Sequence, residues 1–166
     1  MAIIGTGDIA KQIKDKSGIV FLASGLSNSS KVTHRDLICE KEIISENWDN
    51  HCVYFSSLSI FYSDSKYTNY KREIERYIKS NCERYTIIRL GNITWGTNPH
   101  TLINFLKNKI KNKEPYEIQD TFRYLCTQDE FDHWINLIPS FNCEMNITGE
   151  RVSVKEIELR IKNGLL

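Results

Sequence analysis

Three side chains near the middle of the chain are of the types that move a proton at a hydroxyl or carbonyl group. Ser57 ends a short apolar run, and Tyr67 and Lys71 follow in a segment with helical spacing of apolar residues. A tyrosine and a lysine four positions apart lie on one face of a helix. An ammonium close to a phenol favours the phenolate, which makes a tyrosine usable as an acid or base near neutral pH. This triplet is therefore a candidate catalytic site.

Alternatives to this triplet are present in the same stretch. Tyr62 and Lys66 repeat the spacing, but that pair straddles the expected helix start, so its members need not share a face. Ser59 competes with Ser57 for the role of the serine. A tyrosine followed by a lysine four residues later also arises by chance in a chain rich in both, so the residues could be ordinary surface or core groups. The predicted helices and strands around these residues are needed to choose between these alternatives.

Composition restricts the class of protein. The 166 residues fit one domain, and 40% hydrophobic with 26% charged residues is ordinary globular composition. A net charge of +1 gives no electrostatic reason to expect nucleic acid or an anionic membrane as a partner. No apolar run approaches the roughly 18 to 20 residues of a membrane span, and the first residues do not resemble a secretory signal. Five scattered cysteines and four scattered histidines predict neither a disulfide framework nor a metal site. We therefore expect a reduced, cytoplasmic, metal-free protein.

Strand-like and helix-like segments alternate along the chain, which predicts an α/β fold with a largely parallel sheet. Expected strands lie at 2–4, 18–23, 52–55 and 85–90, and expected helices at 11–16, 33–45, 65–81 and 101–111. After Pro115 the pattern predicts short strands at 116–118, 124–126 and 145–147, and helices at 128–139 and 152–161.

Two loops that follow expected strands could bind phosphate or ribose. Gly5–Ala10 (GTGDIA) has the glycine spacing of a strand–turn–helix pyrophosphate site, where small residues let the backbone approach the ligand. A plain strand–helix turn would have the same pattern. Apart from Leu26, the residues of segment 24–30 are small and mostly hydrogen-bonding, so the segment either cradles a ligand group or forms a simple connection.

Taken in order, these segments resemble the extended short-chain dehydrogenase/reductase superfamily, in particular its NAD-dependent epimerase/dehydratase family. The stretches that carry the resemblance are IIGTGDIA, GIVFLAS, VYFSSLSIF, YTNYK, IRLGNITWG, RYLCTQDEF and NITGERVSVKEI. They run from one end of the chain to the other. YTNYK matches the family's Tyr-x-x-x-Lys motif, and the spacing of Ser57 to Ile60–Phe61 favours Ser57 over Ser59 as the family's serine.

The resemblance implies a fold and an activity. The expected fold is a reduced Rossmann-like, mostly parallel sheet flanked by helices, with a small C-terminal α+β extension. It would form one domain over residues 1–166, with a core at about 1–112 and a substrate-side portion at about 113–166. The implied activity is epimerisation or keto-sugar reduction of a nucleotide-linked sugar with NAD or NADP. A homodimer through 33–45 and 65–81 is a further expectation of the resemblance.

The resemblance also assigns roles to individual residues. Ser57 and Tyr67 would contact the reacting oxygen, and Lys71 would also bind the nicotinamide ribose. The cofactor-binding set is Gly5, Thr6, Gly7, Asp8, Ile9, Ala23, Ser24, Gly25 and Lys71, and the substrate-binding set is Ser59, Asn92 and Arg123. Arg89 is either near the ligand or a structural ion-pair partner. Leu58 and Ser59 stand where a dehydratase would carry an acidic pair, which argues against dehydration.

The sequence departs from the family after the glycine-rich turn. The segment 11–17 is too short for the helix, strand, helix and strand that the family places there, so the acidic residue that binds the adenosine ribose has no counterpart. This motivates a second hypothesis, a degenerate non-catalytic relative that acts as a binding or regulatory subunit. The abbreviated form, with its ASGLSNS loop, resembles proteins assigned to bacterial surface-polysaccharide sugar pathways.

Overall fold

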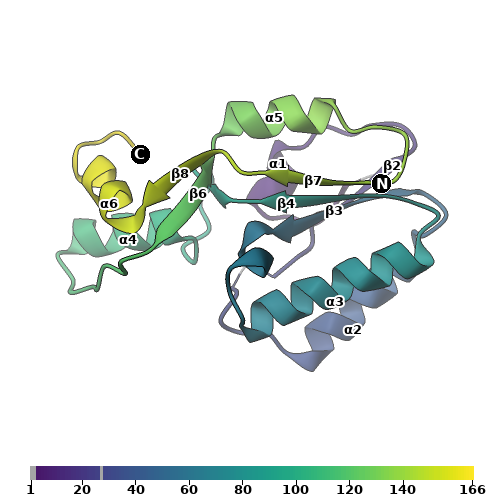
Figure 1. The fold of residues 1–166 in the computed structure, drawn as a ribbon, viewed down its shortest axis with the longest axis horizontal. Helices are drawn as coiled ribbons and strands as arrows, with labels where there is room; N and C mark the ends of the chain where they lie inside the picture. Colours follow the sequence, from purple (N-terminus) through teal and green to yellow (C-terminus); the bar gives the residue numbers. More distant parts are fainter. Residues whose placement is uncertain (1–2, 27) are drawn as a thin grey trace.

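The computed structural model describes residues 3–26 and 28–166 and arranges them in two sheets with helices around them (Figure 1). The strands are β1 (Ile3–Ile4), β2 (Ile19–Leu22), β3 (His51–Ser57), β4 (Arg84–Leu90), β5 (Asn92–Ile93), β6 (Phe122–Cys126), β7 (Cys143–Ile147) and β8 (Glu150–Ser153). The helices are α1 (Asp8–Gln12), α2 (His34–Ser45), α3 (Lys66–Asn81), α4 (Leu102–Asn112), α5 (Gln128–Asn136) and α6 (Val154–Lys162), with a short 3-10 turn, η1, at Leu58–Phe61. In this described part of the chain, no helix has both the length and the apolar character needed to cross a membrane.

The main sheet contains five parallel strands in the order β1-β2-β3-β4-β7. β3 and β4 lie at its centre, and six of the seven β3 residues are buried. Strands covered on both faces carry continuous apolar runs rather than an alternating pattern, which is why the sequence of β2, β3 and β4 is recognisable. The α/β fold with a mostly parallel sheet, predicted from the sequence, is confirmed.

Helices cover both faces of this sheet, as Figure 1 shows. On one face, Phe21, Val53, Phe55 and Ile88 form a core with residues of α5 and the end of α1. On the other face, Val20, Leu22, Cys52, Tyr54 and Ile87 pack against α2 and α3. Successive strand residues point to opposite faces, so the same strands supply both cores.

The connections β1-α1-β2 and β2-α2-β3 have opposite hands. Both step the same way across the sheet, yet α1 lies on one face and α2 on the other. About 98% of such crossovers are right-handed, so if β2-α2-β3 has the usual hand, β1-α1-β2 is left-handed. In the common strand order 3-2-1-4-5-6, the first helix leads to a strand beyond the other edge of β1. Among the described residues no strand pairs with that edge of β1, and α1 keeps the face it would have in the longer sheet.

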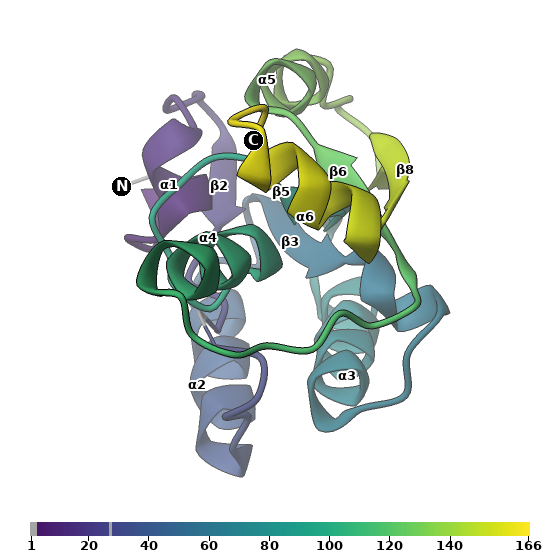
Figure 2. The same cartoon turned by 90° about the vertical axis from the view of Figure 1, so that its left-hand side faces the viewer.

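A smaller unit follows the end of the main sheet. It holds a second sheet in the order β5-β6-β8 and the helices α4 and α6, which lie next to each other in Figure 2. Its core is built from Ile103, Leu106, Leu125, Val152, Val154 and Ile157. β7 belongs to the main sheet while α4 packs in the smaller unit, so each unit draws on both sides of residue 112.

The structure corrects several element predictions. Residues 116–118 form no strand, because Tyr116 and Ile118 pack on the core of the smaller unit without pairing to a neighbouring chain segment. β5 was not predicted and β8 was assigned in part to the last helix, since both are short. α1 begins at Asp8 rather than Lys11, and α5 ends at Asn136 rather than Pro139.

Candidate active site

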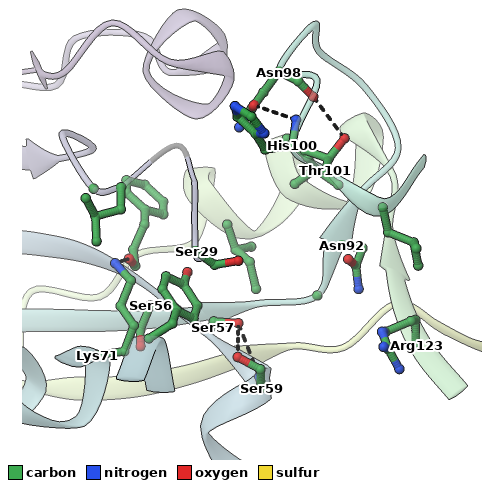
Figure 3. A pocket seen from close by; sticks show the side chains of 18 of the residues that line it. Ser29, Ser56, Ser57, Ser59, Lys71, Asn92, Asn98, His100, Thr101 and Arg123 are labelled. Atoms are coloured by element: carbon green, nitrogen blue, oxygen red, sulfur yellow. Dashed lines mark hydrogen bonds between the residues drawn. The ribbon is translucent and has the colours of Figure 1, made fainter. Parts of the chain in front are cut away.

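A cleft of about 1290 Å³ opens at the carboxyl ends of β1, β2, β3 and β4. The main sheet forms one wall, and the loop before α4 together with β5 and β6 forms the other (Figure 3). In open α/β sheets, ligands bind outside the carboxyl ends of the strands. The location and size of the cleft therefore fit a ligand larger than a single small metabolite.

Ser57 lies at the end of β3 and faces this cleft (Figure 3). Its Oγ accepts a hydrogen bond from the backbone N–H of Ser59 at 3.2 Å, which caps the following 3-10 turn. The two serine hydroxyl oxygens are 2.8 Å apart and share a hydrogen bond. Both serines line the cleft.

Tyr67 lies in the first turn of α3 and also lines the cleft. Ser65 caps the helix: its Oγ accepts from the backbone N–H of Thr68, while the Thr68 hydroxyl accepts from the backbone N–H of Ser65. This reciprocal capping fixes the first turn. Within the described residues the Tyr67 hydroxyl has no hydrogen-bond partner, so it is available to a ligand. Tyr62 precedes the helix, so Tyr62 and Lys66 do not share a helix face.

Lys71 is held in place one turn further along α3. The side chain is buried, with the residue 3% exposed, and its Nζ donates to the Tyr54 hydroxyl at 2.8 Å and to the Phe55 carbonyl at 3.1 Å. Nζ is 4.6 Å from the Tyr54 ring centroid and 5.9 Å from that of Tyr67. Burial raises the pKa of Tyr54 well above its ordinary value, so this phenol stays neutral and accepts from the ammonium. An ammonium has three donors, and one remains for a ligand in the cleft.

The glycine-rich turn contributes only part of its predicted set. Gly7, Asp8 and Ile9 line the cleft, whereas Gly5 and Thr6 do not. Gly5 has a φ of +133°, and a Cβ there would lie 2.3 Å from the Ala23 carbonyl oxygen. Gly5 is therefore required for the close approach of two strand ends, and this packing role differs from the predicted contact with the cofactor.

Asp8 is engaged by the opposite wall rather than pointing freely into the cleft. Its Oδ2 accepts from the backbone N–H groups of Thr97 at 3.0 Å and Asn98 at 2.9 Å. Burial opposes ionisation, but these backbone donors outweigh it and lower the pKa of Asp8 below its ordinary value. The carboxylate thus joins the glycine-rich turn to the loop before α4.

The loop after β2 passes over Lys71. Ala23 and Gly25 line the cleft, whereas Ser24, which was predicted with them, does not. A Cβ at Gly25 would lie 3.1 Å from the Lys71 Nζ. Glycine at this position therefore lets the backbone cross close to the ammonium.

The residues predicted on the substrate side all line the cleft. Ser59 lies in η1, Asn92 in β5 and Arg123 in β6 (Figure 3). The Arg123 guanidinium is held by the Thr121 hydroxyl at 2.7 Å and the Gln119 side chain at 3.0 Å. Arg89 does not line the cleft, because its guanidinium is buried against two glutamates, which makes it a structural residue.

Several cleft residues were not found from the sequence. Lys11, Tyr62, His100 and Arg151 line it, and the Arg151 guanidinium stacks 3.8 Å over the Phe122 ring. Each comes from a different segment; Tyr62 was noted in the sequence only as part of a repeated tyrosine–lysine spacing, and no motif marked the other three side chains. Lys11, Lys71, Arg123 and Arg151 give the lining a cationic character, because Asp8 is the carboxylate among the described lining residues and is already engaged.

We compared the chain with protein families, curated sequences and solved structures. No protein-family model and no curated protein sequence matches the chain. Solved structures do match. The Bordetella bronchiseptica enzyme WbmG in complex with NAD and UDP superposes with a TM-score of 0.62 at 16% identity, over 79% of this chain and 48% of WbmG. MoeE5 in complex with UDP-glucose and NAD gives 0.62 at 18% identity over 78% of this chain and 52% of MoeE5. The Thermus thermophilus UDP-glucose 4-epimerase in complex with NAD gives 0.58 at 14% identity, over 78% of this chain and 53% of the epimerase.

These likenesses show the fold. The chain has a Rossmann-like α/β architecture and spans about half the length of the solved structures that it matches. Its architecture is that of nucleotide-sugar epimerase and dehydratase structures in an abbreviated form. The resemblance seen in the sequence is thereby confirmed at the level of the fold.

Proposed function

We propose that the chain binds NAD or NADP and epimerises or reduces a nucleotide-linked sugar at a Ser57–Tyr67–Lys71 site. The observation that carries the proposal is that these three side chains, from β3 and α3, line one cleft at the carboxyl edge of the main sheet. A role in surface-polysaccharide sugar biosynthesis is part of the proposal and rests on the sequence resemblance alone. Solved structures of the same fold contain NAD with UDP or UDP-glucose, which supports the choice of ligands.

The described residues support a division of labour at the reacting oxygen. The Tyr67 hydroxyl, without a partner in the described structure, is placed to exchange a proton with a sugar hydroxyl or ketone. Ser57 holds the same oxygen by a hydrogen bond, and the buried Lys71 Nζ lies 5.9 Å from the Tyr67 ring centroid, so its positive charge acts on the reacting groups. Bound NAD or NADP would supply hydride transfer at the sugar carbon.

The cleft also fits the cofactor electrostatically. Lys11, Lys71, Arg123 and Arg151 line it, and the Asp8 carboxylate is turned to backbone N–H groups. A Cβ at Gly7 would meet no atom within 4 Å, so the turn leaves open space beside the cleft. Diphosphate groups of a dinucleotide or a nucleotide sugar are the anions such a lining would bind. Lys71 would hold the nicotinamide ribose, and the Gly7–Ile9 turn would hold the diphosphate of the cofactor.

A second candidate function is a non-catalytic binding or regulatory subunit. The specific observation in its favour is that, in the described part of the chain, no strand pairs with the outer edge of β1, beyond which the longer fold would carry the strands next to the adenosine. Without those strands, much of the surface that orders the adenosine half is absent. The two candidates differ in a single measurable property, the ability to bind a nicotinamide dinucleotide.

Titration of the purified protein with NADH and with NADPH, followed by nicotinamide fluorescence, tests the proposal. Saturable binding of either, competed by the oxidised cofactor, is expected for the oxidoreductase. Absence of binding by both would refute the enzyme and leave the binding subunit. Turnover is then assayed with a panel of UDP- and dTDP-linked sugars.

The Tyr67→Phe variant tests the proposed proton donor. Removal of the hydroxyl should lower turnover by about 100-fold or more, because general acid–base catalysis contributes about 10²- to 10⁴-fold. NADH affinity should stay unchanged, since the ring remains. Tyr62→Phe is the matched control, because Tyr62 lines the same cleft and has the same spacing to a lysine. Equal losses in both variants, or no loss in Tyr67→Phe, would remove Tyr67 from the role.

A further inference from the structure

A buried glutamate lies directly behind the proposed site. Glu40, in the middle of α2, is 5% exposed, although glutamate is seldom buried without a compensating charge. Its Oε2 accepts a hydrogen bond from the Tyr70 hydroxyl of α3. Its Oε1 is buried and has no hydrogen-bond partner among the described residues. Such an oxygen is costly to bury, so its environment needs an explanation.

Glu40 and Lys71 approach the same point beneath Gly25. A Cβ built on Gly25 would lie 3.1 Å from the Lys71 Nζ and 3.9 Å from the Glu40 Oε1. The two groups form no direct ion pair, because Nζ is turned to the Tyr54 hydroxyl and the Phe55 carbonyl. Lys71 lines the cleft, whereas Glu40 lies one layer deeper. The carboxyl is therefore close enough to act on the ammonium electrostatically without touching a ligand.

We propose that Glu40 is a positioning residue whose protonation state sets how much positive charge Lys71 presents to the cleft. When Glu40 is protonated, the ammonium is balanced only by dipoles and aromatic rings, and its charge acts on the cleft. When Glu40 ionises, it compensates that charge from behind. The consequence for cofactor binding rests on the proposed function, whereas the coupling of Glu40 to Lys71 does not.

The surroundings of Glu40 keep its carboxyl protonated up to a higher pH than is usual for a glutamate. Burial is the largest effect and raises the pKa of Glu40 above its ordinary value, Lys71 opposes this, and Asp36 adds to it. The titratable groups that face the carboxyl are Asp36 on α2, Tyr54 on β3, and Tyr70 and Lys71 on α3. With Lys71 the cation among them, its charge is the one that Glu40 can compensate.

The coupling can be measured without any ligand by NMR of the protein labelled with ¹⁵N-lysine. The Nζ resonance of Lys71, assigned by its loss in Lys71→Met, should shift as Glu40 titrates. In Glu40→Gln, which keeps the shape and an acceptor for Tyr70 but cannot ionise, that shift should disappear. Glu73→Gln is the control, because Glu73 also lies in the α2–α3 layer but pairs with Lys41 at 2.7 Å. If the Nζ resonance of Lys71 depends on pH in the same way in wild type and in Glu40→Gln, the proposal is overturned.

A second variant keeps the proposal testable if Glu40→Gln does not fold. Tyr70→Phe removes the donor that stabilises the ionised carboxyl, so the midpoint of the Lys71 shift should move to higher pH. A purely structural role for Glu40 would not move this midpoint. An unchanged or lowered midpoint in Tyr70→Phe would contradict the inference.

The functional consequence is measured by NADH titration across about pH 5 to 9. Wild-type affinity should fall about tenfold as pH rises through the Glu40 transition, and Glu40→Gln should lack this fall, since a tenfold change corresponds to about 1.4 kcal/mol. Binding with no such fall in wild type would refute the consequence. Absence of NADH binding at every pH would refute the proposed function, while the NMR titration still decides on Glu40.

Discussion

Lys71, Arg89 and Glu40 are all buried in or against the main sheet, but their charged groups have different kinds of partners. Arg89 is matched by Glu75, with Nε–Oε1 at 2.9 Å and Nη2–Oε2 at 2.5 Å, and by Glu144. Lys71 receives a hydroxyl, a carbonyl and aromatic rings instead. A charge that is fully paired contributes to the scaffold. A charge that is left partly unpaired beside a cleft is available to a ligand.

Replacement of Arg89 by alanine should therefore reveal a structural role. The change leaves the buried Glu75 without its partner, and we expect a loss of about 3 to 5 kcal/mol in the free energy of unfolding. Arg160→Ala is the control, because its pairs with Glu150 and Glu156 are exposed to solvent and should contribute little to the free energy of unfolding. Urea denaturation of the two variants measures the difference. Similar losses would show that burial of the Arg89 network adds nothing.

At the scale of elements, the β1-α1-β2 connection differs from the β2-α2-β3 connection that follows it. α1 has only five residues and lies on the face opposite α2, although both connections step in the same direction. Its position is understandable if the glycine-rich turn and α1 pack as a unit on β1, independently of where the chain goes next. The Asp8 contact with the loop before α4 then ties this turn to the smaller unit.

The junction between the two units should be sensitive at Gly91. A Cβ there would lie 2.4 Å from the Tyr124 carbonyl oxygen, so Gly91→Ala must push β6 away from the end of β4. We expect a loss of about 1 to 3 kcal/mol in stability, as for other overpacked sites, and weaker substrate binding because Asn92 and Arg123 move. Gly7→Ala is the stability control, since its Cβ would meet nothing within 4 Å. An unaltered melting temperature for Gly91→Ala would contradict the close approach of Gly91 to Tyr124.

At the scale of the whole molecule, a shortened sheet and a small α+β unit together enclose the cleft. The smaller unit supplies Asn92, Arg123 and Arg151, while the main sheet supplies Ser57 and Lys71 comes from the helix packed on it. Neither unit has a complete set of candidate residues. The site therefore depends on the packing between them, and conditions that destabilise the fold should affect the cleft as well.

Stability of the whole molecule should depend on pH through Glu40. Burial raises the pKa of Glu40 in the folded state above its value of 4.5 when unfolded. The unfolded chain therefore loses this proton first, and the stabilising contribution, complete at low pH, is lost as pH rises through the folded-state pKa. Glu40→Gln cannot lose it, so its stability relative to wild type should increase with pH, by about 1.4 kcal/mol per unit of pKa shift. Urea midpoints measured along a pH series check this, and a relative stability that stays constant or falls would show that Glu40 ionises normally.

Local signals in the sequence were sufficient for the main sheet and most helices. Apolar runs predict β2, β3 and β4 because strands covered on both faces need apolar residues throughout, and Thr33, Ser65 and Thr101 cap helices as their types indicate. The spacing of Tyr67 and Lys71 predicts a shared face of a helix, and the structure places both with Ser57 on one cleft. Their catalytic roles stay predictions.

Tertiary structure alone decided the rest, because the deciding contacts join segments far apart in the chain. β5 and β8 are too short to be recognised before their partner β6 is in place. Gly5 and Ser24 belong to the right loops, but the direction of each residue depends on how the loops pack, and neither lines the cleft. Glu40 has the sequence context of a surface helix residue and became a buried neighbour of Lys71 only when α2 and α3 packed side by side. A sequence determines which segments can bury apolar surface, whereas the burial of a single charge is determined by the elements that pack around it.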